Sequence, residues 1–219
     1  MSSETQTQTQ ENKYVLNYFN RHGKVELAKL IFHAANTKYE DNFIENLTDS
    51  DTNLGFMPYL QVNDVKIPLI SVICRYLAKE FDLAGDSHLD QAKTDAIAQT
   101  VMLLIDTYYR NVFNIEDIDT KRINLKSYLE NDVESAADTV ENLIHLYSKN
   151  GDFCVGDKLT YADLFVFEMA QHYFPSEDNQ FVQRFPKLYK IKNSVEQHSK
   201  VSDYIKTKSY KKSKVQREF

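Results

Sequence analysis

The sequence has few of the residues from which phosphate loops, metal sites and disulfide frameworks are built. Its five glycines form neither a GxGxxG nor a GxxxxGK pattern, and no GxSxG nucleophile motif occurs. The six histidines show no HxxxH or HExxH spacing, so we expect no metal site. The two cysteines, Cys74 and Cys154, lie far apart and outside any CxxC pair. We therefore expect reduced thiols in a cytoplasmic protein.

Long apolar runs are also absent. No run approaches the roughly 18–20 residues of a membrane span, and no basic segment followed by an apolar one opens the chain, so we expect neither membrane insertion nor secretion. The net charge of −6 is uneven, because six basic residues and one acidic residue give residues 206–219 a charge of +5 and leave −11 for the rest. This acidic body argues against nucleic-acid binding. The basic end favours a solvated terminus, with contact to RNA or an anionic surface as the alternative.

Strand and helix patterns alternate over the first 80 residues. Residues 1–13 alternate threonine and glutamine with nothing to bury, which predicts a disordered leader. Hydrophobic periodicity then predicts a strand, a helix, a strand, a hairpin and a helix, at residues 14–19, 25–35, 38–44, 57–67 and 69–80. This order indicates a small α/β domain over residues 14–80.

The second part of the chain has helical periodicity almost to its end. After a linker at residues 81–88, the pattern predicts an all-helical domain over 89–208 and a basic tail at 209–219. Its helices are expected near residues 89–113, 121–149, 160–172, 186–198 and 200–207. Thr160 and Asp163 have the spacing of a capping box, in which each side chain bonds the other residue's backbone.

Five short motifs occur in a specific order along the chain. They are Tyr18-Phe-Asn-x-x-Gly23, Met57-Pro58, Ile73-x-Arg-Tyr-Leu77, Asp82-Leu-Ala-Gly85 and Val155-Gly-x-x-Leu-Thr-x-Ala-Asp163. Together they resemble the cytosolic glutathione transferases over residues 14–208, most closely the sigma-like class that includes prostaglandin D synthases and S-crystallins. The resemblance implies a thioredoxin-like N-terminal domain, an all-α C-terminal domain, a homodimer, and glutathione as co-substrate if the protein is active.

The resemblance assigns Tyr18 the catalytic role. A free thiol titrates near ~8.5, so little glutathione thiolate exists at neutral pH. A hydroxyl that donates a hydrogen bond to the sulfur favours the thiolate and lowers the pKa of the thiol. Tyr18 lies at the end of the first predicted strand, where the family places this tyrosine.

The remaining glutathione contacts fall on residues that depart from the family pattern. Lys24 keeps the charge of the expected arginine but loses its planar fork, and Asn53 falls near an expected lysine. The backbone of Met57 would hold the cysteinyl unit, presented by a cis peptide bond to Pro58. The resemblance places these cofactor-binding contacts on Lys24, Asn53, Met57, Pro58, Leu69 and Ile70.

The largest departure lies at the start of the helix predicted at residues 69–80. Leu69 and Ile70 replace a Gln-Ser pair whose hydroxyl, with the helix N-terminus, binds the γ-glutamyl carboxylate. Leu103 replaces the aspartate that meets the glutathione amine from the partner subunit, and Phe56 replaces a polar residue before Met57. Each lost charge-assisted hydrogen bond costs about 1.5–3 kcal/mol, or roughly 10- to 150-fold in affinity.

Two functions remain open. The first is a glutathione-transferase-like protein with a largely eroded site and a weak or non-catalytic binding or structural role, whose apolar replacements serve a small hydrophobic ligand or the dimer contact. The alternative is an active transferase that conjugates glutathione to small electrophiles through Tyr18.

Overall fold

The computed structural model describes residues 12–19, 23–45, 56–174, 179–207 and 210. Residues 1–11 of the predicted leader, Asn53, and the predicted basic tail apart from Tyr210 lie outside these residues.

The N-terminal part forms a four-stranded mixed sheet with strand order β2-β1-β3-β4. The strands are β1 (Tyr14–Phe19), β2 (Glu40–Ile44), β3 (Tyr59–Val62) and β4 (Val65–Pro68). β1 pairs in parallel with β2 and antiparallel with β3, and β3 and β4 form the predicted hairpin. Asn63 adopts a positive φ of 52° in the hairpin turn, which asparagine tolerates better than most residues.

Two of the described helices pack against this sheet. They are α1 (Val25–Ala34), which connects the parallel strands, and α3 (Ile70–Glu80). Alternation along β1 buries Tyr14, Leu16 and Tyr18 on one face. Tyr14 contacts Phe32 of α1 edge to face, at 5.4 Å between ring centroids.

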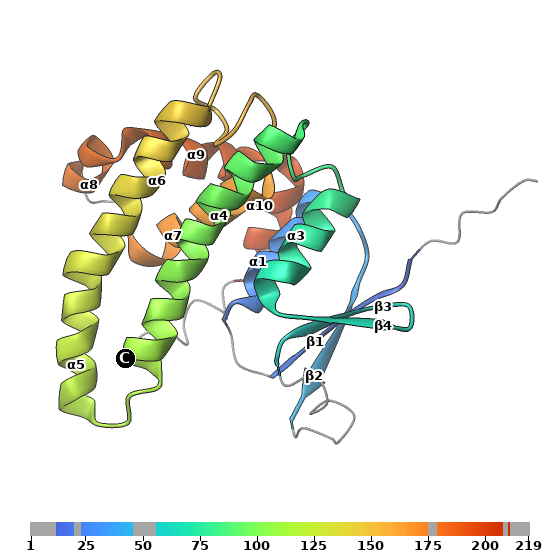
Figure 1. Ribbon diagram of the computed structural model, residues 1–219, viewed down its shortest axis with the longest axis horizontal. Coiled ribbons are helices and arrows are strands. Elements are labelled where there is room, and N and C mark those ends of the chain that lie inside the picture. Colours follow the sequence, from blue (N-terminus) through green and yellow to red (C-terminus); the bar gives the residue numbers. More distant parts are fainter. Residues whose placement is uncertain (1–11, 20–22, 46–55, 175–178, 208–209, 211–219) are drawn as a thin grey trace, which may run out of the picture.

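The C-terminal part is helical. Its helices are α4 (His88–Tyr108), α5 (Ile118–Ser127), α6 (Val133–Tyr147), α7 (Tyr161–Tyr173), α8 (Asn179–Arg184), α9 (Pro186–Gln197) and α10 (Ser199–Ile205). α7 is the central helix, buried at every residue from Tyr161 to Ala170. In Figure 1 the sheet lies on the right and the long helices on the left, with α1 and α3 between them. The architecture is thus a thioredoxin-like domain followed by an all-α domain, as predicted.

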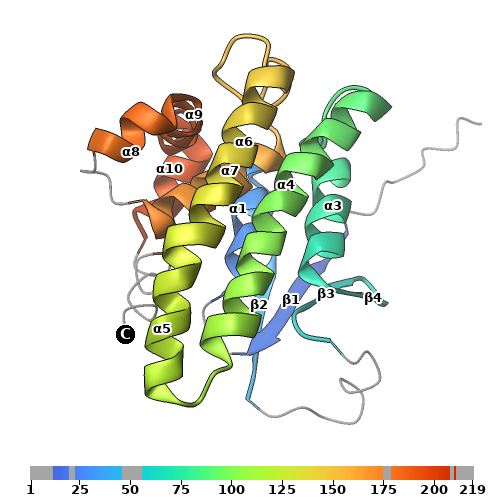
Figure 2. The same cartoon turned by 60° about the vertical axis from the view of Figure 1, so that its left-hand side comes forward.

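Two π-helical turns interrupt the long helices. Tyr109–Phe113 follows α4, and Tyr128–Asp132 joins α5 to α6. Figure 2 shows α5 and α6 continuing as one long helix beside α4. The periodicity predicted the helical span of both regions but not the wider turns, because one additional residue in a turn barely changes the apolar pattern.

The contact between the two parts depends on polar side chains as well as on packing. Arg75 of α3 donates a hydrogen bond from Nε to Asp95 of α4 at 2.8 Å, and the Tyr161 hydroxyl bonds the same carboxylate.

The predicted capping box of α7 is present. The Asp163 carboxylate accepts hydrogen bonds from the backbone N–H groups of Thr160 at 2.7 Å and Cys154 at 2.6 Å.

Over the described residues, none of the helices combines the length and the apolar character needed to cross a membrane.

Candidate functional site

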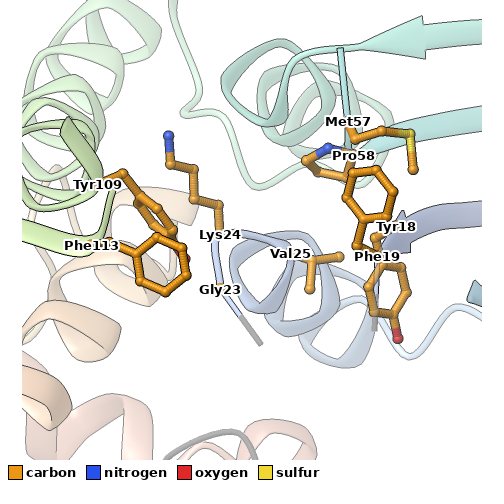
Figure 3. Close-up of a pocket in the computed structure, with 9 residues that line it drawn as sticks. All are labelled: Tyr18, Phe19, Gly23, Lys24, Val25, Met57, Pro58, Tyr109 and Phe113. Carbon is orange, nitrogen blue, oxygen red and sulfur yellow. The ribbon is translucent and has the colours of Figure 1, made fainter. Parts of the chain in front are cut away.

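A pocket of about 280 Å³ lies where the end of β1, the start of α1 and the turn after α4 meet. It is lined by Tyr18, Phe19, Gly23, Lys24, Val25, Met57, Pro58, Tyr109 and Phe113 (Figure 3). The pocket therefore brings together four of the residues that the resemblance assigns to the glutathione site: Tyr18, Lys24, Met57 and Pro58. The Met57–Pro58 peptide bond is cis, as the resemblance implies.

Tyr18 contributes its ring to the pocket, but its hydroxyl points away from Met57 and Pro58 in Figure 3. The hydroxyl donates a hydrogen bond to Asp41 Oδ1 at 2.9 Å and accepts one from Lys29 Nζ at 2.6 Å. Burial, and then the nearby Asp41 carboxylate, raise the pKa of Tyr18. The hydroxyl proton is therefore held inside the protein.

Lys24, just before α1, forms an ion pair with Asp106 of α4. Its ammonium also lies 5.0 Å from the centroid of the Tyr109 ring, within the range of a cation–π contact. The charge that the resemblance assigns to glutathione binding is thus matched by a carboxylate of the helical domain.

Gly23 permits the close approach of the two domains at the pocket wall. A β-carbon at this position would collide with the hydroxyl oxygen of Tyr109. Tyr109 and Phe113 both belong to the π-helical turn that follows α4. A larger residue at this position would therefore require the Tyr109 side chain to move.

Among the described residues, the rest of the lining is mainly apolar. It comes from Phe19, Val25, Met57, Pro58 and Phe113. Phe56, next to this lining in sequence, is 57% exposed. An apolar pocket with few polar groups suits a small hydrophobic ligand better than a highly charged tripeptide.

Leu69 and Ile70 are not among the residues that line this pocket. Ile70 is the first residue of α3 and lies in the core at 5% exposure, whereas Leu69 is 43% exposed. Leu69 has a φ of 69°, a left-handed conformation that is strained for a bulky side chain. Leu69, the N-cap residue of α3, provides no side-chain hydrogen bond to the helix N-terminus.

Neither cysteine is suited to act as a nucleophile. Cys74 and Cys154 are fully buried and form no disulfide. Burial raises the pKa of both thiols, which disfavours the reactive thiolate. Within the described ranges, no group of three or more His, Cys, Asp and Glu side chains is placed to hold a metal ion.

A buried polar network behind the pocket was not predicted from the sequence. Glu26 is 1% exposed and Lys29 4%, and their charged groups lie 3.9 Å apart. The hydroxyl of Tyr204, on α10, donates to Glu26 at 2.7 Å, while Lys29 lies 3.3 Å from Asp41. Two charged residues on the apolar face of the predicted helix 25–35 were the signal for this network, since buried charges require partners.

Comparison with known proteins finds a glutathione transferase domain and full-length relatives. Residues 104–208 match the family model for the glutathione S-transferase C-terminal domain. S-crystallin 4 of Enteroctopus dofleini is 28% identical, over 90% of this chain and 97% of that protein. Hematopoietic prostaglandin D synthase of Gallus gallus is also 28% identical, over 88% of this chain and 94% of that protein.

A solved structure agrees with these sequence relatives. The Nu-class glutathione transferase of Haemonchus contortus is 28% identical and superposes with a TM-score of 0.71, covering 90% of this chain and 97% of that one. The comparisons show a glutathione S-transferase C-terminal domain over residues 104–208, and the relatives include the two sigma-like kinds of protein that the motifs of this chain resemble.

Proposed function

We propose that this protein has a largely eroded glutathione site, with weak or no transferase activity, and serves a binding or structural role. One observation carries the proposal: among the residues that the structure describes, all three polar side chains that line the pocket already have partners within the protein. Tyr18 bonds Asp41, Lys24 pairs with Asp106, and Tyr109 also interacts within the protein.

Glutathione would have to displace these partners. It carries two carboxylates and one ammonium, and each needs an opposite charge or a hydrogen bond when it leaves water. Releasing Lys24 from Asp106 would leave that carboxylate without its cation, which offsets what the ligand gains. A small hydrophobic ligand meets no such cost, because the remaining lining is mainly apolar.

The alternative function is an active transferase that uses glutathione as co-substrate. It is favoured by the presence of Tyr18, Lys24 and the cis Met57–Pro58 bond around one pocket. In that case Tyr18 must exchange its hydrogen bond to Asp41 for one to the glutathione sulfur.

A turnover assay with glutathione and 1-chloro-2,4-dinitrobenzene separates the two functions. We expect a rate close to the uncatalysed one, unchanged by Tyr18→Phe, because the hydroxyl proton is already donated to Asp41. The matched control is Tyr147→Phe, which removes a hydroxyl from a half-buried tyrosine outside the pocket. A substantial rate that disappears only in Tyr18→Phe would replace the proposed function by the alternative.

We also propose that the protein is a cytoplasmic homodimer. Two buried thiols without a disulfide suit a reducing compartment. Leu103, at the position that the resemblance places beside the partner subunit, is 57% exposed. An apolar side chain exposed on α4 is better accommodated against a second subunit than in water.

A further inference from the structure

The Tyr18 hydroxyl has no proton left for a ligand. A phenolic hydroxyl offers one donated hydrogen and accepts through its lone pairs. The hydrogen goes to Asp41 Oδ1 at 2.9 Å, and Lys29 Nζ occupies the acceptor side at 2.6 Å. The Lys29 ammonium also lies 4.6 Å from the centroid of the Tyr18 ring.

The strand register fixes Asp41 beside Tyr18. In the parallel pair of β1 and β2, Tyr18 lies opposite Phe43 and Leu16 opposite Asp41. Asp41 and Phe43 are two residues apart, so their side chains leave the same face of β2. The rings of Tyr18 and Phe43 meet edge to face at 5.0 Å, which positions the phenol along β2 toward Asp41.

Two carboxylates hold Lys29 in place, one on the buried Glu26 and one on Asp41, whose side chain is 33% exposed. Lys29 is 4% exposed as a residue, and its ammonium lies 3.3 Å from Asp41 and 3.9 Å from Glu26. Glu26 is in turn held by the Tyr204 hydroxyl at 2.7 Å. A buried ammonium cannot leave such carboxylates without a large desolvation cost. The hydrogen bond that Lys29 donates to the Tyr18 hydroxyl therefore stays in place.

We propose that Asp41 and Lys29 form a clamp that holds the Tyr18 hydroxyl in a non-catalytic hydrogen bond, with Asp41 as the residue that withholds its proton from the pocket. The inference rests on the proposed function, since it explains why a tyrosine at the family's catalytic position leaves the protein weak or inactive. Asp41 is a positioning residue: it acts through Tyr18 and does not line the pocket.

The ionisation of Tyr18 tests the clamp directly. Carbon-13 label at tyrosine Cζ reports each phenol by NMR, and Tyr18→Phe identifies the Tyr18 signal by its loss. In the full-length protein we expect the Tyr18 signal to stay at its neutral position until alkaline unfolding, in line with the raised pKa of Tyr18. In Asp41→Ala the Asp41 carboxylate is lost while the Lys29 cation remains beside the phenol. The ionisation constant of Tyr18 should therefore rise at least about tenfold.

The matched control is Glu40→Ala. Glu40 precedes Asp41 on β2, and its carboxylate, 62% exposed, pairs with Lys13 at the surface at 3.2 Å. This variant removes the same charge from the same strand and should leave the Tyr18 titration unchanged. Equal titration of Tyr18 in the wild type and in Asp41→Ala, or an equal shift in both variants, would overturn the clamp.

If Asp41→Ala does not fold, Asp41→Asn provides the same test with the side-chain shape retained. It removes the charge and keeps one acceptor, so we expect the ionisation constant of Tyr18 to rise by a smaller factor. An unchanged ionisation constant would overturn the clamp. Different measurements would contradict the clamp and the proposed function. The Tyr18 titration decides the clamp, whereas wild-type turnover that depends on Tyr18 decides against the proposed function.

Discussion

Ile70 stands at the first position of α3, where the resemblance expects a hydroxyl that binds a carboxylate. Its side chain is buried in the core at 5% exposure, among residues such as Ile73 and Cys74 of the same helix. Loss of the hydroxyl and gain of core packing therefore occur at the same position. A single substitution to serine is not expected to restore a glutathione contact.

We predict that Ile70→Ser destabilises the protein by about 3 kcal/mol, because it removes buried methyl groups and leaves a hydroxyl in an apolar site. The measurement is the free energy of unfolding in urea. Ser71→Ala, one position along and only half-buried, is the control and should change stability by less than about 0.5 kcal/mol. A neutral Ile70→Ser would show that Ile70 is not a core residue.

The sequence predicted several residues of the site but not the side chains that bond them. Tyr18, Lys24, Met57 and Pro58 were predicted as site residues, and they line one pocket. The partners of Tyr18 and Lys24 were not predicted, because Asp41 and Asp106 are 23 and 82 residues away in sequence. Only the folded chain brings such carboxylates to these side chains.

The helices and strands were easier to predict than the contacts between them. Strong periodicity located β1, the β3–β4 hairpin and α4 within a few residues, and the Thr160–Asp163 pair marked the start of α7. The six-residue helix α8 was missed, because it is too short for a periodic pattern. The contact between α1 and α10 was not predicted either, since Glu26 and Tyr204 are 178 residues apart.

The α1–α10 contact carries a pH-sensitive group. His33 of α1 stacks on the Tyr204 ring of α10, at 3.8 Å between ring centroids. Burial and then the Lys29 cation lower the pKa of His33, against a smaller opposite effect of Asp41. Below pH 6.5, the ordinary pKa of histidine, His33 therefore binds a proton more readily in the unfolded chain than in the folded protein. The free energy of unfolding should fall as the pH falls through this range.

We predict that His33→Phe, which keeps an aromatic ring without the titrating group, weakens this loss of stability between about pH 7.5 and 5.5. Urea denaturation at several pH values measures it. His88→Gln, at an exposed histidine, should retain the wild-type pH dependence. Because burial also lowers the pKa of His198, some dependence should remain in His33→Phe; a profile identical to the wild type would contradict the assignment to His33.

For the whole molecule, the account predicts a homodimer with an apolar contact. Sedimentation velocity of the wild type should give twice the chain mass of 25.6 kDa. Leu103→Glu places a charge at the exposed apolar position on α4 and should shift the protein toward the monomer. Leu146→Glu, at a leucine of α6 that is 69% exposed, is the control and should leave the dimer intact. A wild-type monomer would contradict the predicted assembly.

Calorimetric titration of the wild-type protein with glutathione, up to several millimolar, shows directly whether the glutathione site is eroded. With Tyr18 and Lys24 held by Asp41 and Asp106, we predict no saturable heat and no rise in melting temperature over this range. Saturable binding near one molecule per chain, with the rise in melting temperature that mass action then requires, would contradict the account.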